Sequence, residues 1–140
     1  MIVLLTLHSL IRWAIIFVAL ATLIKFALGL VQKHPYDRMA GGLSAAFSGL
    51  MDTQALLGGL FFVLQGAAMP GGFALRYRWE HLAIMLIAVV VGHLPALWKK
   101  LDDRQRYRNG LLAILVALLL VVVGVSALPG NRWLVVSGLF

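Results

Sequence analysis

Four ionisable side chains interrupt apolar stretches of this chain: His8, Arg12, Asp52 and His81. An ionisable group inside a membrane span costs about 2.5–3.5 kcal/mol on insertion scales, so each of the four is a candidate for function. At about 1.5 Å of rise per residue, His8 lies roughly one turn inside its apolar run, and Arg12 lies one turn deeper on the same face. His81 begins a later run at a similar depth. We therefore predict a polar cluster in the outer leaflet of the membrane. It comprises His8, Arg12, Asp52, Gln54, Glu80 and His81.

The two histidines of this cluster have the chemistry of haem ligands. A six-coordinate b-type haem in a helical bundle needs two imidazoles from facing helices at about one depth, each with its second ring nitrogen held by a partner. His8 and His81 meet the depth condition, so we expect them to be metal ligands. They could instead hydrogen-bond lipid headgroups or backbone carbonyls. His93 lies about 18 Å beyond His81 along the helix, so one haem cannot bind both. His34 falls in a polar loop and is expected to be solvated.

The other members of the cluster are expected to support a cofactor. Asp52 lies near the middle of its span, at a depth that the side chain of Arg12 can reach, so we predict that the two form an ion pair. Such a pair could serve only to fix helix register, because an unpaired buried charge would be far more costly. With Gln54 nearby, the pair could instead handle a proton or a quinone, or balance a haem propionate. Glu80 is more simply an interfacial group beside Arg76.

The composition places these residues in a membrane protein. Of 140 residues, 62% are hydrophobic and 12% are charged, with a mean hydropathy of +0.97, whereas soluble domains average about 45–50% apolar and about 25% charged residues. A soluble domain is therefore excluded. The chain has no cysteine, which excludes disulfides, thiolate metal sites and thiol nucleophiles. The net charge of +7 indicates orientation and contact with anionic lipid rather than nucleic acid.

Four apolar runs are long enough to cross the hydrocarbon core of a bilayer, which takes about 20 residues. We predict an all-α fold, an integral membrane four-helix bundle with up-down-up-down order, in a single domain over residues 1–140. The connections are short and leave no room for a second domain. The spans are expected at about 2–30, 41–65, 79–98 and 111–128. The tail from Trp133 to Phe140 is too short to cross, so we expect it at the interface or against the bundle.

The basic residues predict how the spans are oriented. Eight of them fall toward one face of the membrane: Lys25, Lys33, Arg38, Lys99, Lys100, Arg104, Arg106 and Arg108. The other face has four: Arg12, Arg76, Arg78 and Arg132. Because basic residues accumulate in cytoplasmic segments, the first face is predicted to be cytoplasmic and both termini to lie on the outer side. The basic stretch from Lys99 to Arg108 is expected to contact anionic lipid.

Several short motifs also carry a family resemblance. They are Leu7-His8-Ser9 followed by Arg12-Trp13, then the stretch Asp52-Thr53-Gln54-Ala55-Leu56-Leu57-Gly58, then Arg78-Trp79-Glu80-His81 with Met85, and an Arg-Trp ending after the last span. With these motifs, nearly the whole chain resembles the small four-helix bacterial membrane proteins labelled "cytochrome B". The resemblance implies a b-type haem with His8 and His81 as its axial ligands, in a multi-pass protein of the bacterial inner membrane.

These observations favour a membrane electron-transfer protein, a b-type haem or quinone-interacting subunit rather than a stand-alone enzyme. His8 and His81 would bind the haem, with Arg12, Asp52 and Gln54 around the cofactor. Electrons would pass between quinol and a docked partner, within a larger respiratory or photosynthetic complex or a homo-oligomer. A cofactor-free accessory or structural subunit is the alternative, in which protein carbonyls or carboxylates would hold the two histidines. A proton or solute pathway lined by Arg12, Asp52 and Gln54 is a third hypothesis.

Overall fold

The computed structural model describes residues 2–130, 132 and 133, and within them the predicted all-α fold is confirmed. Those residues form helices and connections, with no strand. Four helical segments are long and apolar enough to cross a membrane, so the chain is a multi-pass membrane protein by length and composition. The elements in order are α1 (Ile2–Val31), α2 (Arg38–Ala68), α3 (Arg76–His93), the 3-10 helix η1 (Leu94–Trp98) and α4 (Asp103–Ser126).

Three helices begin before the apolar runs that predict them, α2 and α3 by three residues and α4 by eight, and an aspartate caps two of the three. α2 starts one residue after Asp37, whose carboxylate accepts a hydrogen bond from the Ala40 N–H at 2.8 Å. α4 starts one residue after Asp102, whose carboxylate accepts from the Gln105 N–H at 2.9 Å. N-cap carboxylates of this kind satisfy backbone donors that the first turn leaves free. Residues 38–40 therefore belong to α2 and the largely polar residues 103–110 belong to α4, although hydropathy leaves them out.

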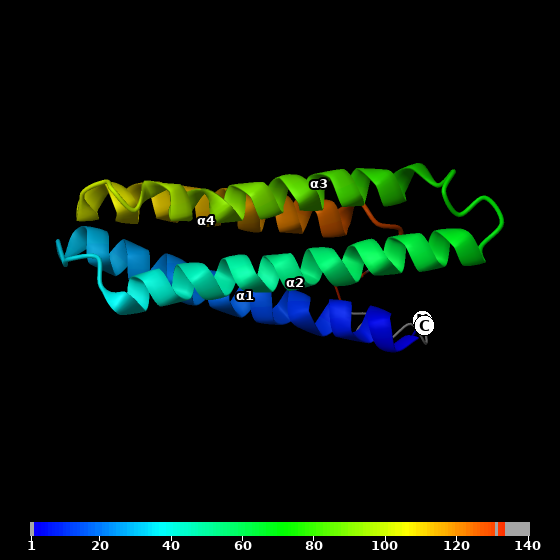
Figure 1. The fold of residues 1–140 in the computed structure, drawn as a ribbon, viewed down its shortest axis with the longest axis horizontal. Helices are drawn as coiled ribbons and strands as arrows, with labels where there is room; N and C mark the ends of the chain where they lie inside the picture. Colours follow the sequence, from blue (N-terminus) through cyan, green and yellow to red (C-terminus); the bar gives the residue numbers. More distant parts are fainter. Residues whose placement is uncertain (1, 131, 134–140) are drawn as a thin grey trace.

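The four helices alternate in direction, and each packs beside the next, as up-down-up-down order requires (Figure 1). α1 also packs against α4 and closes the bundle, while α2 and α3 pack less closely than the other neighbours. One end of the bundle holds the start of α1, the α2–α3 connection and the end of α4. We call this the cavity end. The opposite end holds the α1–α2 and α3–α4 connections, and we call it the tyrosine end.

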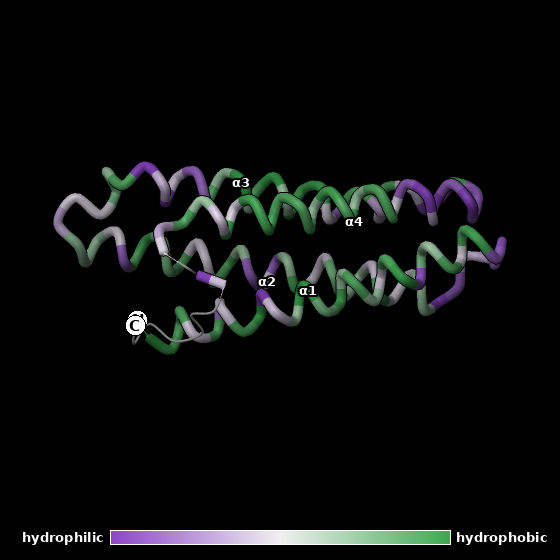
Figure 2. The backbone as a smooth tube through the Cα atoms, turned by 180° about the vertical axis from the view of Figure 1, so that it is seen from behind, coloured by the Kyte–Doolittle hydropathy of each residue, from purple (hydrophilic) through white to green (hydrophobic). Residues whose placement is uncertain are grey.

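Hydrophilic residues gather mainly toward the two ends, with hydrophobic residues between them (Figure 2). This distribution fits helices that cross an apolar layer and emerge on both sides. The predicted outward position of both termini is an orientation relative to the membrane, and it stays a prediction. The predicted tail from Trp133 to Phe140 lies outside the described residues, except for Trp133 itself, which packs against the bundle core.

Aromatic side chains fasten the tyrosine end. Phe26 of α1 and Tyr107 of α4 are fully buried, with ring centroids 5.6 Å apart, and the Tyr107 hydroxyl donates to the Pro35 carbonyl at 3.0 Å. Gly29 and Gly110 lie directly against these two rings. A Cβ atom on Gly110 would come within 2.5 Å of Phe26 Cε2. The close approach of α1 and α4 therefore depends on glycine at both positions.

Candidate functional site

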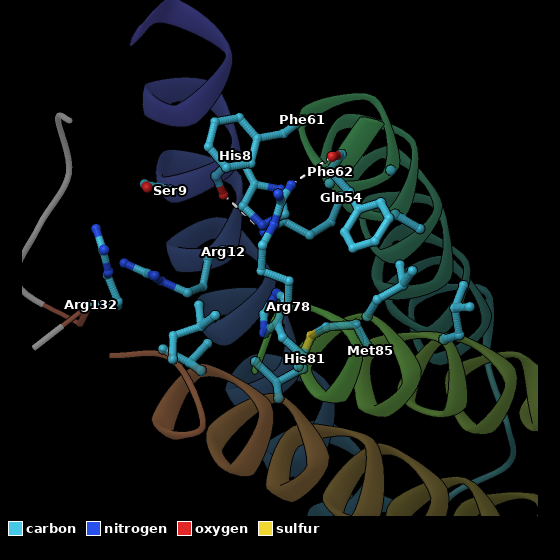
Figure 3. Close-up of a pocket in the computed structure, with 18 of the residues that line it drawn as sticks. His8, Ser9, Arg12, Gln54, Phe61, Phe62, Arg78, His81, Met85 and Arg132 are labelled. Carbon is cyan, nitrogen blue, oxygen red and sulfur yellow. Dashed lines mark hydrogen bonds between the residues drawn. The ribbon is translucent and has the colours of Figure 1, made fainter. Parts of the chain in front are cut away.

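A cavity of about 200 Å³ lies among the four helices toward the cavity end, and Figure 3 shows the side chains around it. Its walls are mostly apolar. The described lining residues include two histidines and three arginines but no Asp or Glu, so the site has an excess of positive charge. The cavity brings together four of the site residues predicted from the sequence: His8, Arg12, Gln54 and His81.

His81 projects from α3 toward the cavity and is held by α4. Its Nδ1 lies 2.8 Å from the carbonyl oxygen of Gly124. Because a carbonyl only accepts hydrogen bonds, Nδ1 carries the proton and Nε2 keeps its lone pair. The contact needs close packing of the two helices, which a glycine allows. A Cβ atom on Gly124 would overlap the terminal methyl group of Met85, one turn along α3.

His8 faces the cavity from α1, and its imidazole has no hydrogen-bond partner among the described residues; its Nδ1 is buried. The ring packs against α2, where a Cβ atom on Gly58 would lie 2.9 Å from its Cε1 atom. Gln54, one turn before Gly58, donates from Nε2 to the His8 backbone carbonyl at 2.9 Å. The Gln54 Oε1 atom is also buried without a partner. The backbone of His8 is therefore anchored to α2, while the imidazole is left free to bind.

Arg12 lies one turn deeper than His8 and is 7% exposed. Its guanidinium carbon lies 5.9 Å and 5.4 Å from the ring centroids of Trp13 and Trp133, and it donates to the Trp133 carbonyl at 3.4 Å. Its Nε atom is buried with no partner among the described residues. Aromatic rings and a backbone carbonyl thus surround this cation, and no carboxylate of the described residues pairs with it.

The predicted pairing of Arg12 with Asp52 is wrong. Asp52 lies outside the cavity, on the outer surface of α2, where its Oδ2 atom is 3.2 Å from His93 Nε2 of α3. Helical geometry explains the error: residues two apart project about 200° from each other. Because Gln54 points toward α1, Asp52 must point away from it.

Glu80 does not join the cavity cluster either. It accepts a hydrogen bond from Arg76 Nε at 2.6 Å on an exposed surface. This is the simpler interfacial role expected for it from the sequence.

Arg78 and Arg132 line the cavity but were not predicted from the sequence to belong to the site, and Arg78 is the more buried contact. It is 7% exposed and donates to the Gly72 carbonyl at 2.8 Å and to the Phe62 carbonyl at 2.6 Å. It therefore fastens the end of α2 and the α2–α3 connection to α3. A signal was present, because Arg78 precedes His81 by three residues and must share its helix face. Counting Arg78 only as an interfacial basic residue overlooked that spacing.

Unsatisfied polar atoms converge on this cavity. Buried polar groups in folded proteins are almost always hydrogen-bonded. Three buried side-chain atoms lack a partner among the described residues, and all three belong to residues that line the cavity: His8 Nδ1, Arg12 Nε and Gln54 Oε1. Their convergence indicates that a ligand or water supplies the missing partners.

Comparison with known protein families, with curated proteins and with solved structures finds no match for the chain. The function is therefore inferred from the chemistry of the cavity itself.

Proposed function

We propose that the cavity binds a b-type haem between His8 and His81 and that the protein is a membrane electron carrier. The observation that carries the proposal is the state of the two imidazoles. One comes from α1 and one from α3, both line one cavity, and among the described residues neither has a partner on the nitrogen that would face iron. Bound haem would supply a reversible one-electron centre inside the membrane.

His81 has the arrangement common to histidine ligands of metals. Such a ligand usually donates its second ring N–H to a carbonyl or carboxylate, which fixes the tautomer and turns the other nitrogen toward the metal. The contact from His81 Nδ1 to the Gly124 carbonyl, 2.8 Å long, meets that requirement. His8 would be the opposite ligand, and the buried Oε1 of Gln54 is an acceptor at the same cavity.

The charge of the cavity fits an anionic cofactor. A haem carries two propionates, and guanidinium groups bind carboxylates through paired hydrogen bonds. Arg12, Arg78 and Arg132 line the cavity, and its described lining contains no carboxylate. We assign Arg12 as the principal propionate partner, because its buried Nε has no other partner among the described residues. Apolar side chains such as Met85 and Val121 would hold the porphyrin ring and exclude water.

The proposal also covers the membrane in which the protein lies and the partners with which it exchanges electrons. We propose a bacterial inner membrane as the location, with anionic lipid at the basic α3–α4 connection. Little of the chain protrudes from the bundle, so a redox partner would dock onto it, within a respiratory or photosynthetic complex or a homo-oligomer. Quinol would be the membrane-soluble electron donor or acceptor.

A cofactor-free accessory subunit is the rival function. The bond from His81 to Gly124 favours it in part, because a carbonyl partner satisfies one nitrogen of that histidine without iron. It leaves the buried, unpartnered Nδ1 of His8 and Nε of Arg12 unexplained. We therefore rank it second.

The test is the reduced-minus-oxidised visible spectrum of protein purified in detergent after expression with added haem precursor. We expect a b-type α-band, and a pyridine haemochromogen assay should give about one haem per chain. His8→Ala and His81→Ala should each abolish the band. His34→Ala is the matched control, since His34 lies on the exposed α1–α2 connection and should leave the spectrum unchanged. A folded, colourless wild-type protein would overturn the haem proposal and leave the accessory role.

A further inference from the structure

A second polar pair lies at the middle of the bundle, outside the cavity. Asp52 of α2 and His93 of α3 contact one another, with their side chains 55% and 41% exposed. Asp52 lies near the midpoint of α2, so it is about 20 Å from either helix end and deep within a segment long and apolar enough to cross a membrane. A carboxylate exposed at that depth is rare and marks a functional site.

The hydrogen bonds of His93 hold its ring between α3 and α2. The Nδ1 atom lies 2.8 Å from the Val89 carbonyl, one turn earlier on α3. The Nε2 atom lies 3.2 Å from Asp52 Oδ2 of α2. The second carboxyl oxygen of Asp52 has no hydrogen-bond partner among the described residues, so it can accept a hydrogen bond from a ligand.

An apolar groove lies beside this pair. Its volume is about 280 Å³, and its lining consists of His93 and four aliphatic residues: Val89, Val90, Leu94 and Leu97. Val90 and Leu97 are themselves 64% and 75% exposed. The backbone at the groove is held in place, because Ser48 of α2 donates to the Gly92 carbonyl at 3.0 Å. An apolar molecule dissolved in the bilayer could therefore reach His93 without entering the bundle.

We propose that Asp52 and His93 form a binding site for a lipid-soluble hydroxylated aromatic ligand of the quinol and quinone class. Such a ligand has a flat apolar ring for the groove, and in its quinol form it has a hydroxyl group that can donate a hydrogen bond to the second carboxyl oxygen of Asp52. This proposal rests on the quinone part of the proposed function, but it does not require haem at His8 and His81. The pair lies about 18 Å from His81 along α3, so the two sites are separate.

A second copy of the chain explains this face less well than a ligand does. A two-fold contact whose axis passes at the Asp52–His93 pair would bring that pair against the same pair of the other copy. In both copies the two side chains are already hydrogen-bonded to each other, so neither pair offers the other a new donor. The neighbouring hydroxyl of Thr53 is taken by the Gly49 carbonyl at 2.9 Å. A quinol hydroxyl can donate a hydrogen bond to the second carboxyl oxygen of Asp52, and the quinol ring fits the apolar groove.

The test is a binding titration of wild-type protein in lipid nanodiscs with ubiquinol-1 and ubiquinone-1, with empty nanodiscs to subtract partitioning. We expect saturable binding of ubiquinol-1 and weaker binding of ubiquinone-1, which has no hydroxyl group to donate. Asp52→Asn and His93→Gln should each weaken ubiquinol-1 binding by about tenfold or more, as expected for loss of a hydrogen bond to a charged group. Thr53→Ala is the matched control, because it changes the adjacent side chain and leaves the pair intact. All variants are first compared by far-UV circular dichroism.

Three outcomes decide the proposal. Weakened binding in both pair variants, with Thr53→Ala unaffected, supports it. Equal affinity of wild type and Asp52→Asn overturns it, and a change of oligomeric state in Asp52→Asn at unchanged affinity would assign the face to a second copy. His8→Ala separates the two sites, since loss of the haem spectrum with retained ubiquinol binding leaves this proposal standing.

Discussion

His81 and Gly124 join α3 to α4 beside the cavity. The imidazole Nδ1 lies 2.8 Å from the glycine carbonyl, and the terminal methyl group of Met85 fills the space beside that glycine that a Cβ atom would take. The distance between the two helices and the orientation of His81 are therefore set at one position. Any change that separates α3 from α4 there should also turn the imidazole.

Gly124→Ala should lower both stability and haem content. The added methyl group would overlap Met85 and lie 3.1 Å from Ile84 Cγ2, and overpacking of this kind costs about 1–3 kcal/mol. Thermal unfolding in detergent and the height of the haem α-band measure the two effects. Gly49→Ala is the control, because a Cβ atom there meets nothing within 4 Å. An unfolding temperature for Gly124→Ala equal to that of the control would contradict the packing argument.

Two adjacent glycines on α2 allow a sharper test of His8. A Cβ atom on Gly58 would lie 2.9 Å from His8 Cε1, whereas one on Gly59 meets nothing within 4 Å. We expect Gly58→Ala to displace the imidazole and reduce haem occupancy, while Gly59→Ala retains it. Haem per chain, measured by pyridine haemochromogen assay, distinguishes the variants. Equal occupancy in both would show that the position of His8 against α2 does not control binding.

Arg78 should contribute more to stability than its exposed neighbour. It is 7% exposed and donates to two backbone carbonyls, and a hydrogen bond from a charged group contributes about 1.5–3 kcal/mol. We expect Arg78→Met to lower the free energy of unfolding by at least that amount. Arg76→Met removes only a surface ion pair, which contributes about 0–1 kcal/mol. Denaturant titration in mixed micelles compares them, and equal losses would count against the role of Arg78.

Hydropathy was sufficient to predict the four helices and their order, because each run exceeds the length that crosses a bilayer. It placed the starts of α2 and α3 three residues too late and that of α4 eight residues too late, because α4 continues through polar residues back to its cap at Asp102. The cavity was partly predictable from depth alone. His8 and His81 lie at one level because both are close to the same end of the bundle. This shared depth could be predicted without knowing which way either side chain points.

The depth of a residue in the membrane does not predict which way its side chain points. Asp52 was assigned to the cavity because Arg12 could reach its level, but helix rotation turns it toward His93. The spacing of Asp52 and Gln54 excludes a shared face, although it does not tell which of the two faces inward. That choice depends on the packing of α1 against α2, where Gln54 finds the His8 carbonyl.

Arg12 should control the reduction potential of the proposed haem. A nearby positive charge stabilises the reduced iron, which has one more electron, so it raises the potential. Arg12→Gln is therefore expected to shift the midpoint potential to a more negative value. Arg76→Gln is the control, because Arg76 is exposed and outside the cavity lining. Redox titration followed at the α-band measures both, and an unchanged potential in Arg12→Gln would remove Arg12 as the propionate partner.

The ion pair at the tyrosine end should make stability depend on pH. Asp37 accepts from Lys25 Nζ at 2.5 Å and from the Ala40 N–H at 2.8 Å, and these two hydrogen bonds, that from Lys25 foremost, lower the pKa of Asp37 below its ordinary value of 3.8. A carboxyl group whose pKa is lower in the folded state stabilises the fold above its ordinary pKa. This contribution is lost as the pH falls below 3.8 toward the pKa of the folded state.

Asp37→Asn should isolate the ion pair, because asparagine is an equally good N-cap residue but carries no charge. We expect its unfolding temperature to lie below that of wild type at neutral pH, and the difference to shrink as the pH falls below 3.8, where Asp37 itself becomes protonated. Asp102→Asn is the matched control, since Asp102 caps α4 without an ion pair among the described residues. Thermal unfolding followed by circular dichroism across this pH range measures the difference, and a gap that stays constant with pH would assign the stabilisation to the cap rather than to Lys25.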